Sequence, residues 1–190
     1  QLVPLMWFSI VGMTLAGLMR RVGWQSVRLA PRLLKGRTPR MIKMKFLPLA
    51  ALHRVLQQRL TAEKATWAVE EVLFTATMAE TVTNFMPAML DPQMDTIARQ
   101  IEKVYSGPGK HQKIVYEKST PTHFQFRIDD CVFVRAMDEL GVRNISHRMC
   151  DADRHFWKNV VRGTGIQFTK EDPTIARGGS CCQIRFTADR

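Results

Sequence analysis

The spacing of hydrophobic residues divides the chain into a helical part and a part that mixes strands with helices. Over residues 46–88, apolar side chains recur every three or four positions, which predicts two helices interrupted near Thr61. A shorter helix is predicted over 94–104. Beyond it, apolar and polar residues alternate over 113–118 and again over 123–128. This alternation is typical of a half-buried β-hairpin.

The remaining C-terminal pattern completes an α+β domain. Helical spacing returns over 130–140 and again over 145–161, and short strands are predicted over 165–170 and 181–187. The order strand, strand, helix, helix, strand, strand is that of helices packed on an antiparallel sheet. We therefore predict one α+β domain over residues 46–190, with an antiparallel sheet of about four strands and packed helices.

The N-terminal residues follow a different pattern, because residues 2–19 carry no charge and Arg20 and Arg21 follow at once. As a helix, this run would span about 27 Å, close to the hydrocarbon thickness of a bilayer. We therefore predict a transmembrane helix over residues 1–19. A buried helix of the globular domain is the alternative.

Residues 20–45 form a basic segment in which Lys and Arg alternate with Trp24 and several Val and Leu residues. Such a segment is expected to lie along anionic lipid headgroups. By the positive-inside rule, the predicted location is the cell inner membrane, single-pass, with the main domain on the cytoplasmic side. A solvated basic loop packed against an acidic partner is the alternative.

The net charge of +11 comes entirely from the N-terminal part of the chain, so it bears on the partners of that part alone. Eleven Lys and Arg residues lie between Arg20 and Arg59, and no acidic residue precedes Glu63. The rest of the chain is neutral, since 28 minus 11 leaves 17 basic residues against 17 acidic ones. No nucleic-acid-binding motif accompanies the basic segment, so no nucleic-acid partner is predicted.

The four cysteines do not form a disulfide or metal pattern. Four are too few to build a disulfide scaffold in a chain of this size, and their spacing contains no C-x-x-C pair. The sequence therefore predicts free thiols and no metal site, and it does not identify a cofactor. The simplest interpretation is that each cysteine is a small buried apolar residue.

The ordered motifs of the last third nevertheless resemble a known family. That family is the L-2-amino-thiazoline-4-carboxylic acid hydrolase family, and the resemblance covers about residues 112–187. The matching positions are Cys131, Leu140-Gly141, Cys150-Asp151, Thr174-Ile175-Ala176, Gly178-Gly179 and Cys182 to Phe186. The chain departs from the family pattern at Val132, where proline is usual, and at Gln183, where aspartate is usual. A more distant resemblance is to vinyl-reductase-type ligand-sensing domains.

The resemblance implies hydrolysis of a C–N bond in a cyclic amidine or a similar small molecule. A cysteine early in a helix favours the thiolate, and His147 lies one turn earlier, where it could take the proton. Asp151 is expected to orient a base or bind the amidinium, and the arginines are expected to bind a carboxylate. The candidate catalytic residues are Cys150, His147 and Asp151, and the candidate substrate-binding residues are Arg148, Arg177, Cys131 and Cys182.

A second hypothesis is a non-catalytic accessory subunit of a membrane protein complex, built on the hydrolase-like fold. The altered motif at Gln183 and the unusual N-terminal segment favour it. Its partners would be integral membrane subunits. Under this hypothesis the candidate cysteines are buried structural thiols, and Gly178-Gly179 is a tight turn.

Overall fold

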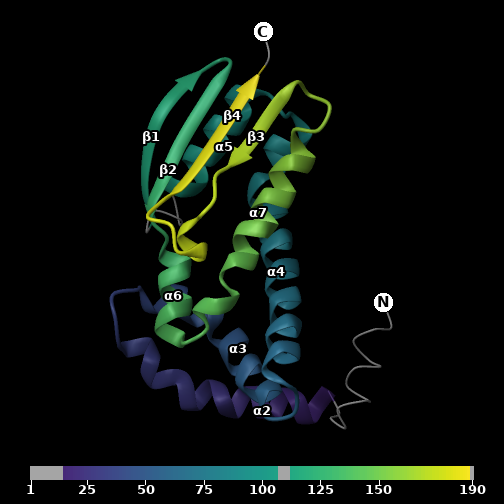
Figure 1. The fold of residues 1–190 in the computed structure, drawn as a ribbon, viewed down its shortest axis with the longest axis vertical. Helices are drawn as coiled ribbons and strands as arrows, with labels where there is room; N and C mark the ends of the chain where they lie inside the picture. The colour runs from purple at the N-terminus through teal and green to yellow at the C-terminus, as the bar shows by residue number, and fades with distance from the viewer. Residues whose placement is uncertain (1–14, 107–111, 189–190) are drawn as a thin grey trace. The chain divides into compact units, whose positions relative to one another are not determined.

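The computed structural model describes residues 15–106 and 112–188, and Figure 1 shows its helices and strands. The α-helices are α2 (Leu15–Leu29), α3 (Arg40–Gln57), α4 (Ala62–Leu90), α5 (Met94–Ser106), α6 (Val132–Leu140) and α7 (His147–Val160). The short 3-10 helices are η1 (Ala30–Leu34), η2 (Arg143–Ile145) and η3 (Ile175–Arg177). The strands are β1 (Lys113–Thr120), β2 (His123–Asp130), β3 (Ile166–Lys170) and β4 (Cys182–Ala188).

The chain folds into two compact units, each built from two stretches of sequence. Unit 1 comprises residues 1–71 and 135–145, and unit 2 comprises residues 72–134 and 146–190. Helices α4 and α6 each contribute residues to both units. The sheet and the family motif around Cys150 and Cys182 therefore belong to unit 2.

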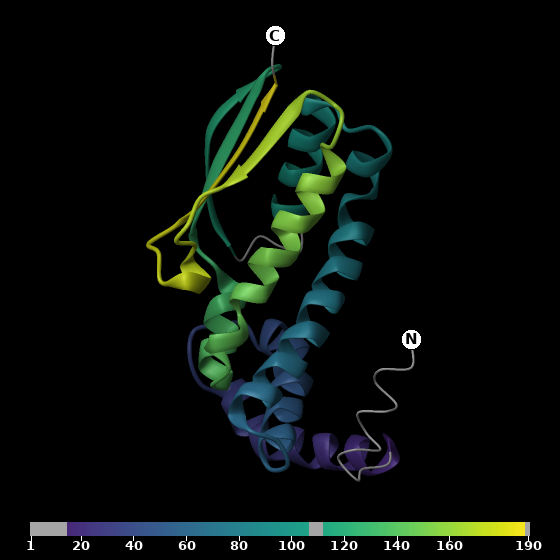
Figure 2. The same ribbon diagram turned by 45° about the vertical axis from the view of Figure 1, so that its right-hand side comes forward.

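Unit 2 is an antiparallel sheet with helices on one face. Its four strands lie in the order β1-β2-β4-β3, and every neighbouring pair is antiparallel. Figure 2 shows α7 running along one face of this sheet. The side chains between sheet and helices form a single apolar cluster, because alternate strand residues point inward. This cluster includes Ile97 and Ile101 of α5, Phe124 and Phe126 of β2, Phe156 and Trp157 of α7, Phe168 of β3, and Ile184 and Phe186 of β4.

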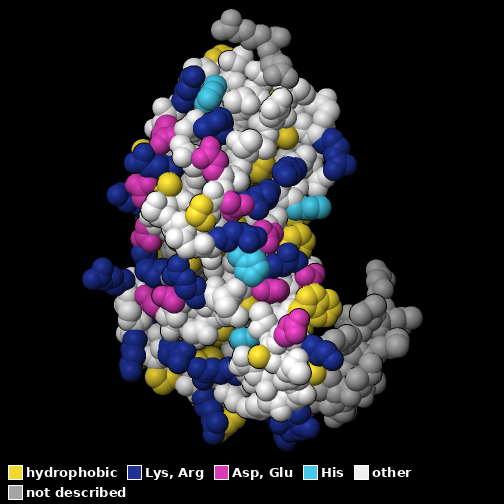
Figure 3. Space-filling model, viewed as in Figure 1, with side chains coloured by type: hydrophobic (Ala, Val, Ile, Leu, Met, Phe, Trp, Pro, Cys, Tyr) yellow, Lys and Arg dark blue, Asp and Glu magenta, His cyan; other side chains and the backbone are white. Residues whose placement is uncertain are grey.

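The opposite face of the sheet carries charged side chains of both signs (Figure 3). Arg127 of β2 pairs with Glu117 at 2.8 Å and with Asp129 at 2.7 Å. Arg185 of β4 pairs with Glu171 at 3.2 Å. This face is polar because the residues between the inward-facing ones point to it. The predicted α+β fold with a four-stranded antiparallel sheet is thus confirmed.

Unit 1 packs α2 against α3 and encloses an ion pair. Its apolar core includes Leu18 and Leu29 of α2 and Phe46, Ala50 and Val55 of α3, each at most 5% exposed. Lys43 is also buried, and its Nζ lies 3.1 Å from Oε2 of Glu139 in α6. The Glu139 carboxylate further accepts hydrogen bonds from the backbone N–H groups of Arg37 and Thr38. Glu139 therefore connects α6 to the segment between η1 and α3.

Replacing Glu139 by alanine is expected to lower the free energy of unfolding by about 3 kcal/mol, because it leaves the buried Lys43 ammonium without its carboxylate. Glu139→Gln is the matched control, since its amide oxygen can still accept the two backbone hydrogen bonds. Urea unfolding of the full chain measures both variants, and the glutamine variant should lose less stability than the alanine variant.

This contribution to stability is expected to depend on pH. Burial acts to raise the pKa of Glu139, but the hydrogen bonds from Lys43, Thr38 and Arg37 outweigh it and lower the pKa below the ordinary 4.5. A pKa lower in the folded than in the unfolded state stabilises above the ordinary value, and the stabilisation disappears as the pH falls through the folded value. Acidification should therefore destabilise the native chain more than Glu139→Ala, and equal acid sensitivity would contradict this assignment.

The prediction of an N-terminal transmembrane helix is wrong. Among residues 15–106 and 112–188, no helix is long and apolar enough to cross a membrane. The described part of the predicted span belongs to α2, which begins at Leu15 and continues through Arg20, Arg21 and Arg28 to Leu29. The charges thus lie inside the helix instead of after it, and residues 1–14 lie outside the described part of the chain. The predicted membrane location and the membrane partners stay predictions.

The basic segment over 20–45 is also more ordered than its pattern indicates. It forms α2, η1 and the start of α3, and four of its residues, Leu29, Leu33, Thr38 and Lys43, are buried. Helix α3 begins before the predicted helix, so Pro48 lies inside it instead of in its first turn. Pro48 is exposed there.

Candidate functional site

Three of the four cysteines converge in unit 2 from distant parts of the sequence. Cys131 follows β2, Cys150 lies in the first turn of α7, and Cys182 begins β4. Cys150 is 7% exposed and Cys182 is 3% exposed. Each is close enough to another of the three to change the pKa of its thiol. The motif cysteines therefore form one cluster beneath the sheet instead of being scattered through the core.

Cys150 and Cys182 form a hydrogen-bonded pair that holds one thiolate. The hydrogen bond from the Cys182 thiol lowers the pKa of Cys150 to about 6, against the opposing effect of burial. The same interaction raises the pKa of Cys182, which stays protonated and donates. The backbone N–H of Ile175 in η3 donates to Sγ of Cys182 at 3.3 Å and fixes this sulfur. Within the pair, this hydrogen bond therefore favours the thiolate on Cys150 and the thiol on Cys182.

A buried lysine lies beside the pair. Lys170 ends β3, its side chain is 3% exposed, and its Nζ lies 3.1 Å from Oδ2 of Asp153 on α7. Burial alone would lower the pKa of Lys170, but the negative charges of Asp153 and Cys150 raise it instead. The resulting ammonium in turn lowers the pKa of Cys150. Thiolate and ammonium thus stabilise each other in a site largely closed to water.

Cys131 behaves differently from the pair. Burial raises the pKa of its thiol to about 11, although backbone hydrogen bonds from Val134 and Phe133 act to lower it. Cys131 is therefore a neutral thiol at physiological pH. It contributes a small, weakly polar wall to the cluster.

The turn after η3 brings Thr174 and Ile175 to the cysteine pair. Thr174 is fully buried, and its hydroxyl lies near Cys150, where it also lowers the thiol pKa. Its Oγ1 completes no hydrogen bond of ordinary geometry within the described residues. A Cβ at Gly179 would lie 1.8 Å from the carbonyl oxygen of Pro173, so only glycine fits this turn. The Gly178-Gly179 motif is therefore a tight turn that positions the segment beside the thiolate.

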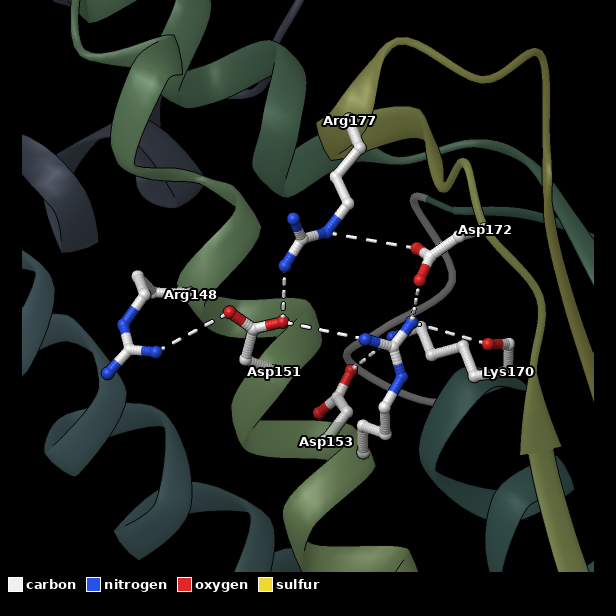
Figure 4. A network of polar contacts seen from close by, with 7 residues as sticks. Arg148, Asp151, Asp153, Lys170, Asp172 and Arg177 are labelled. Atoms are coloured by element: carbon white, nitrogen blue, oxygen red, sulfur yellow. Dashed lines mark hydrogen bonds and ion pairs between the residues drawn. The ribbon is translucent and has the colours of Figure 1, made fainter.

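Asp151 is the centre of an arginine network at the outer side of the cluster (Figure 4). Its carboxylate lies 2.7 Å from Nη2 of Arg177, 3.5 Å from Nη1 of Arg148 and 3.6 Å from Nη1 of Arg154. Arg154 and Arg177 also contact Asp172, at 2.9 Å and 3.8 Å. The network extends from Asp172, which is 52% exposed, to Asp151, which is 20% exposed.

The structure thus groups most of the predicted site residues, in two layers. Cys131, Cys150 and Cys182 form the inner layer, and Asp151 with Arg148 and Arg177 forms the outer one. His147 begins α7, but the largest effects on the pKa of Cys150 come from Cys182, Lys170, Asp153 and Thr174, besides burial. The role of His147 as a base for Cys150 stays a prediction.

Sequence reasoning missed Lys170, Asp153 and Thr174. A signal for Lys170 is present in the strand alternation, because Ile166 and Phe168 point inward and the next inward position is Lys170. A signal for Asp153 is its spacing of three residues from Cys150 on one helix. Two sequence features therefore indicate this site: a lysine at an inward-facing strand position, and an aspartate three residues after a cysteine on a helix.

Gln183, one of the two positions that depart from the family pattern, lies outside the cluster. Gln183 follows Cys182 in β4, so its side chain points to the opposite face of the sheet. There its Nε2 donates to Oε2 of Glu117 at 3.3 Å. The change at this position therefore removes no group from the surroundings of Cys150.

No metal centre is found in the part of the chain that the structure describes. Among residues 15–106 and 112–188, no group of three or more His, Cys, Asp or Glu side chains is placed to hold a metal ion.

Solved structures with a similar arrangement are only remotely related. An Fe(II) unliganded H-NOX protein from K. algicida is 14% identical, with 76% of this chain and 74% of that chain covered and a TM-score of 0.26. The H-NOX domain from Shewanella oneidensis in the Fe(II)CO state is 12% identical, with 77% and 76% covered and a TM-score of 0.29. Likeness at this level supports no conclusion about this chain. No curated protein sequence matches it.

A family model does match most of the sequence. It is described as L-2-amino-thiazoline-4-carboxylic acid hydrolase, and it covers residues 39–186. The matched region runs from the residue before α3 through β4, so it includes the cysteine pair, Lys170 and the arginine network, as well as helices that precede the motifs. The chain belongs to the L-2-amino-thiazoline-4-carboxylic acid hydrolase family.

Proposed function

We propose that this chain hydrolyses a ring C–N bond of a cyclic amidine carboxylate of the 2-amino-thiazoline-4-carboxylate type, with the Cys150 thiolate as nucleophile. The family supplies the substrate class. The observation that carries the proposal is the Cys150 sulfur, which receives a hydrogen bond from Cys182 and lies in the field of the buried Lys170 ammonium. A thiol activated in this way is a nucleophile suited to an electrophilic amidine carbon.

In the first step, Sγ of Cys150 bonds to the ring carbon between nitrogen and sulfur. The ring C–N bond then breaks, and its electron pair stays on the nitrogen, which leaves with a proton from the Lys170 ammonium. The exocyclic amino group supplies the second proton of the new amine, and the product is an imidodithiocarbonate whose carbon is bonded to Sγ, to the former ring sulfur and to the exocyclic nitrogen. It still holds the whole substrate on Cys150. Asp153 keeps Lys170 directed at the thiolate, because it pairs with Nζ at 3.1 Å.

In the second step, a water molecule attacks the same carbon and gives a proton back to Lys170. The C–Sγ bond breaks and the Cys150 thiolate is regenerated with its hydrogen bond from Cys182. The net change is the addition of one water to the substrate. Arg177, which is 39% exposed, is the group that we assign to the substrate carboxylate, in exchange for one of its contacts with Asp151 and Asp172.

The non-catalytic alternative has less support from the site. It relied on the unusual N-terminal segment and on the change at Gln183. The Gln183 side chain lies on the polar face of the sheet, where it contacts Glu117. The inner residues of the site, including Cys150, Cys182 and Lys170, are all present.

The proposal is tested by incubating the purified full chain with 2-amino-thiazoline-4-carboxylate and following the products by mass spectrometry. The expected product is the substrate plus one water, with its ring opened at the C–N bond. An intact substrate after prolonged incubation with the folded chain would contradict the proposed function. A product opened at the C–S bond would contradict the proposed bond cleavage.

A further inference from the structure

A groove lined by basic side chains lies in unit 1, whereas the cysteine cluster belongs to unit 2. It has a volume of about 440 Å³, within the range of ligand-binding pockets, and it lies between α2 and α3. Its α2 wall carries Arg20, Arg21, Trp24, Gln25 and Arg28, and the other wall is formed by Val55 of α3 and by Gln58, which follows α3. The groove is thus lined by three guanidinium groups and one large aromatic ring.

The charges of this groove favour an anion with several oxygen acceptors. No acidic residue precedes Glu63 in the sequence, so α2 and α3 carry none. The Arg28 guanidinium lies 5.5 Å from the centre of the Trp24 ring, which orients it beside an apolar surface. Planar guanidinium groups match the geometry of phosphate oxygens and bind them bidentately.

An exposed apolar stripe lies on the same helix as the arginines. Leu15, Met19 and Val27 of α2 are 60%, 64% and 63% exposed. At about 100° per residue, they lie within about 120° of the circumference of α2, so they form one broad apolar side of the helix. In Figure 3, dark blue side chains follow the lower edge of the molecule, where α2 lies in Figure 1. An apolar stripe next to a row of cations is typical of helices that lie in a membrane interface.

We propose that α2 binds the surface of a bilayer that contains anionic phospholipids. The groove takes the phosphate of one headgroup, and Leu15, Met19 and Val27 enter the layer just below the headgroups. The stripe favours a lipid over a free phosphate, because a soluble anion would leave these side chains in water. The helix lies parallel to the surface, since Arg20, Arg21 and Arg28 interrupt its length and exclude a membrane-crossing orientation.

The test is sedimentation of the full chain with vesicles. Phosphatidylcholine vesicles with added phosphatidylglycerol are expected to bind the chain, and vesicles of phosphatidylcholine alone are expected to bind it far less. The triple variant Arg20→Gln, Arg21→Gln and Arg28→Gln should lose about 100-fold in affinity. The same three positions changed to lysine should keep most of the binding, because the positive charges that attract the anionic headgroups remain.

The matched control removes three positive charges elsewhere. Arg99, Lys118 and Arg162 are exposed residues of unit 2, and their change to glutamine should leave vesicle binding nearly unchanged. The proposal would be overturned if this control variant lost as much vesicle affinity as the α2 glutamine variant, or if the native chain bound neutral and anionic vesicles equally well. A further test combines the double variant Met19→Ser, Val27→Ser with competition by glycerol phosphate. If the double variant binds vesicles as well as the native chain does, and glycerol phosphate displaces the vesicles completely, the proposal is overturned in favour of a site for soluble phosphate.

Discussion

A chain with Cys150 replaced by serine is expected to lose roughly 10³-fold or more in kcat/KM on 2-amino-thiazoline-4-carboxylate, since removal of a covalent nucleophile removes the bond-forming group itself. The hydroxyl of serine does not ionise near neutral pH, so the hydrogen bond from Cys182 and the charge of Lys170 cannot activate it. The measurement is the initial rate of ring opening, with substrate well below KM. The size of serine is close to that of cysteine, so the fold should be kept.

Cys181→Ser is the control for this experiment. Cys181 is adjacent to Cys182 in sequence, but it precedes β4, and it belongs to neither the cysteine pair nor the arginine network. Its turnover should equal that of the unmodified chain. Retained activity in Cys150→Ser would remove this residue from the mechanism, and equal losses in both variants would indicate a general effect on the sheet.

The variant Cys182→Ala is expected to lose activity near neutral pH and to regain part of it in alkali. Without the thiol donor, the largest influence that lowers the pKa of Cys150 is gone, and the pKa moves from about 6 towards the ordinary 9.0. Below its pKa a thiol is protonated, so the rising limb of the pH profile must move to higher pH. At about pH 7 the thiolate fraction, and with it kcat/KM, should fall on the order of tenfold.

Cys182→Ser distinguishes the donor from the nucleophile. A serine hydroxyl still donates a hydrogen bond to the Cys150 thiolate, so this variant should keep a rising limb close to that of the native chain. A structural defect would instead lower kcat at every pH without moving the limb. If Cys182→Ser were as inactive as Cys150→Ser, Cys182 would be the attacking sulfur and the assignment of the pair would be reversed.

The fold of unit 2 was predictable from local pattern. The alternation of Phe124, Phe126 and Ile128 predicted β2 and the face it buries, and the structure confirms both. The helix over 145–161 was predicted to within two residues of α7. In each of these elements the apolar residues recur at the spacing of a strand or of a helix, so the type of element can be predicted from its own residues alone.

The failed prediction at the N-terminal end has a physical cause. Hydropathy gives the length of an uncharged run, but the residue at which a helix ends depends on which of its side chains are packed against the rest of the protein. Leu18 and Leu29 of α2 lie 11 residues apart and are both buried, so the helix continues through the intervening arginines. The long arginine side chains reach water on the other side of the helix. An apolar run followed by charge therefore does not by itself mark the boundary of a helix.

The motif identified the cysteines that lie together, but not the charged residues around them. The motif identified Cys150 and Cys182, but only the register of the sheet places them together with Lys170. Residue Lys170 is paired with Ile184 across β3 and β4, two positions beyond Cys182. Whether a cysteine is ionised depends on such long-range neighbours, and single-sequence spacing does not contain them. The ion pair of Lys43 and Glu139 was missed for the same reason.

The most direct test of the central claim is a search for the covalent intermediate. The unmodified chain is mixed with 2-amino-thiazoline-4-carboxylate, quenched in acid during turnover, digested and mapped by mass spectrometry. The account predicts that the peptide containing Cys150 is heavier by one substrate molecule, and that the increment disappears after the substrate is consumed. Turnover with the increment on Cys182, or with no increment on any cysteine peptide, would contradict it.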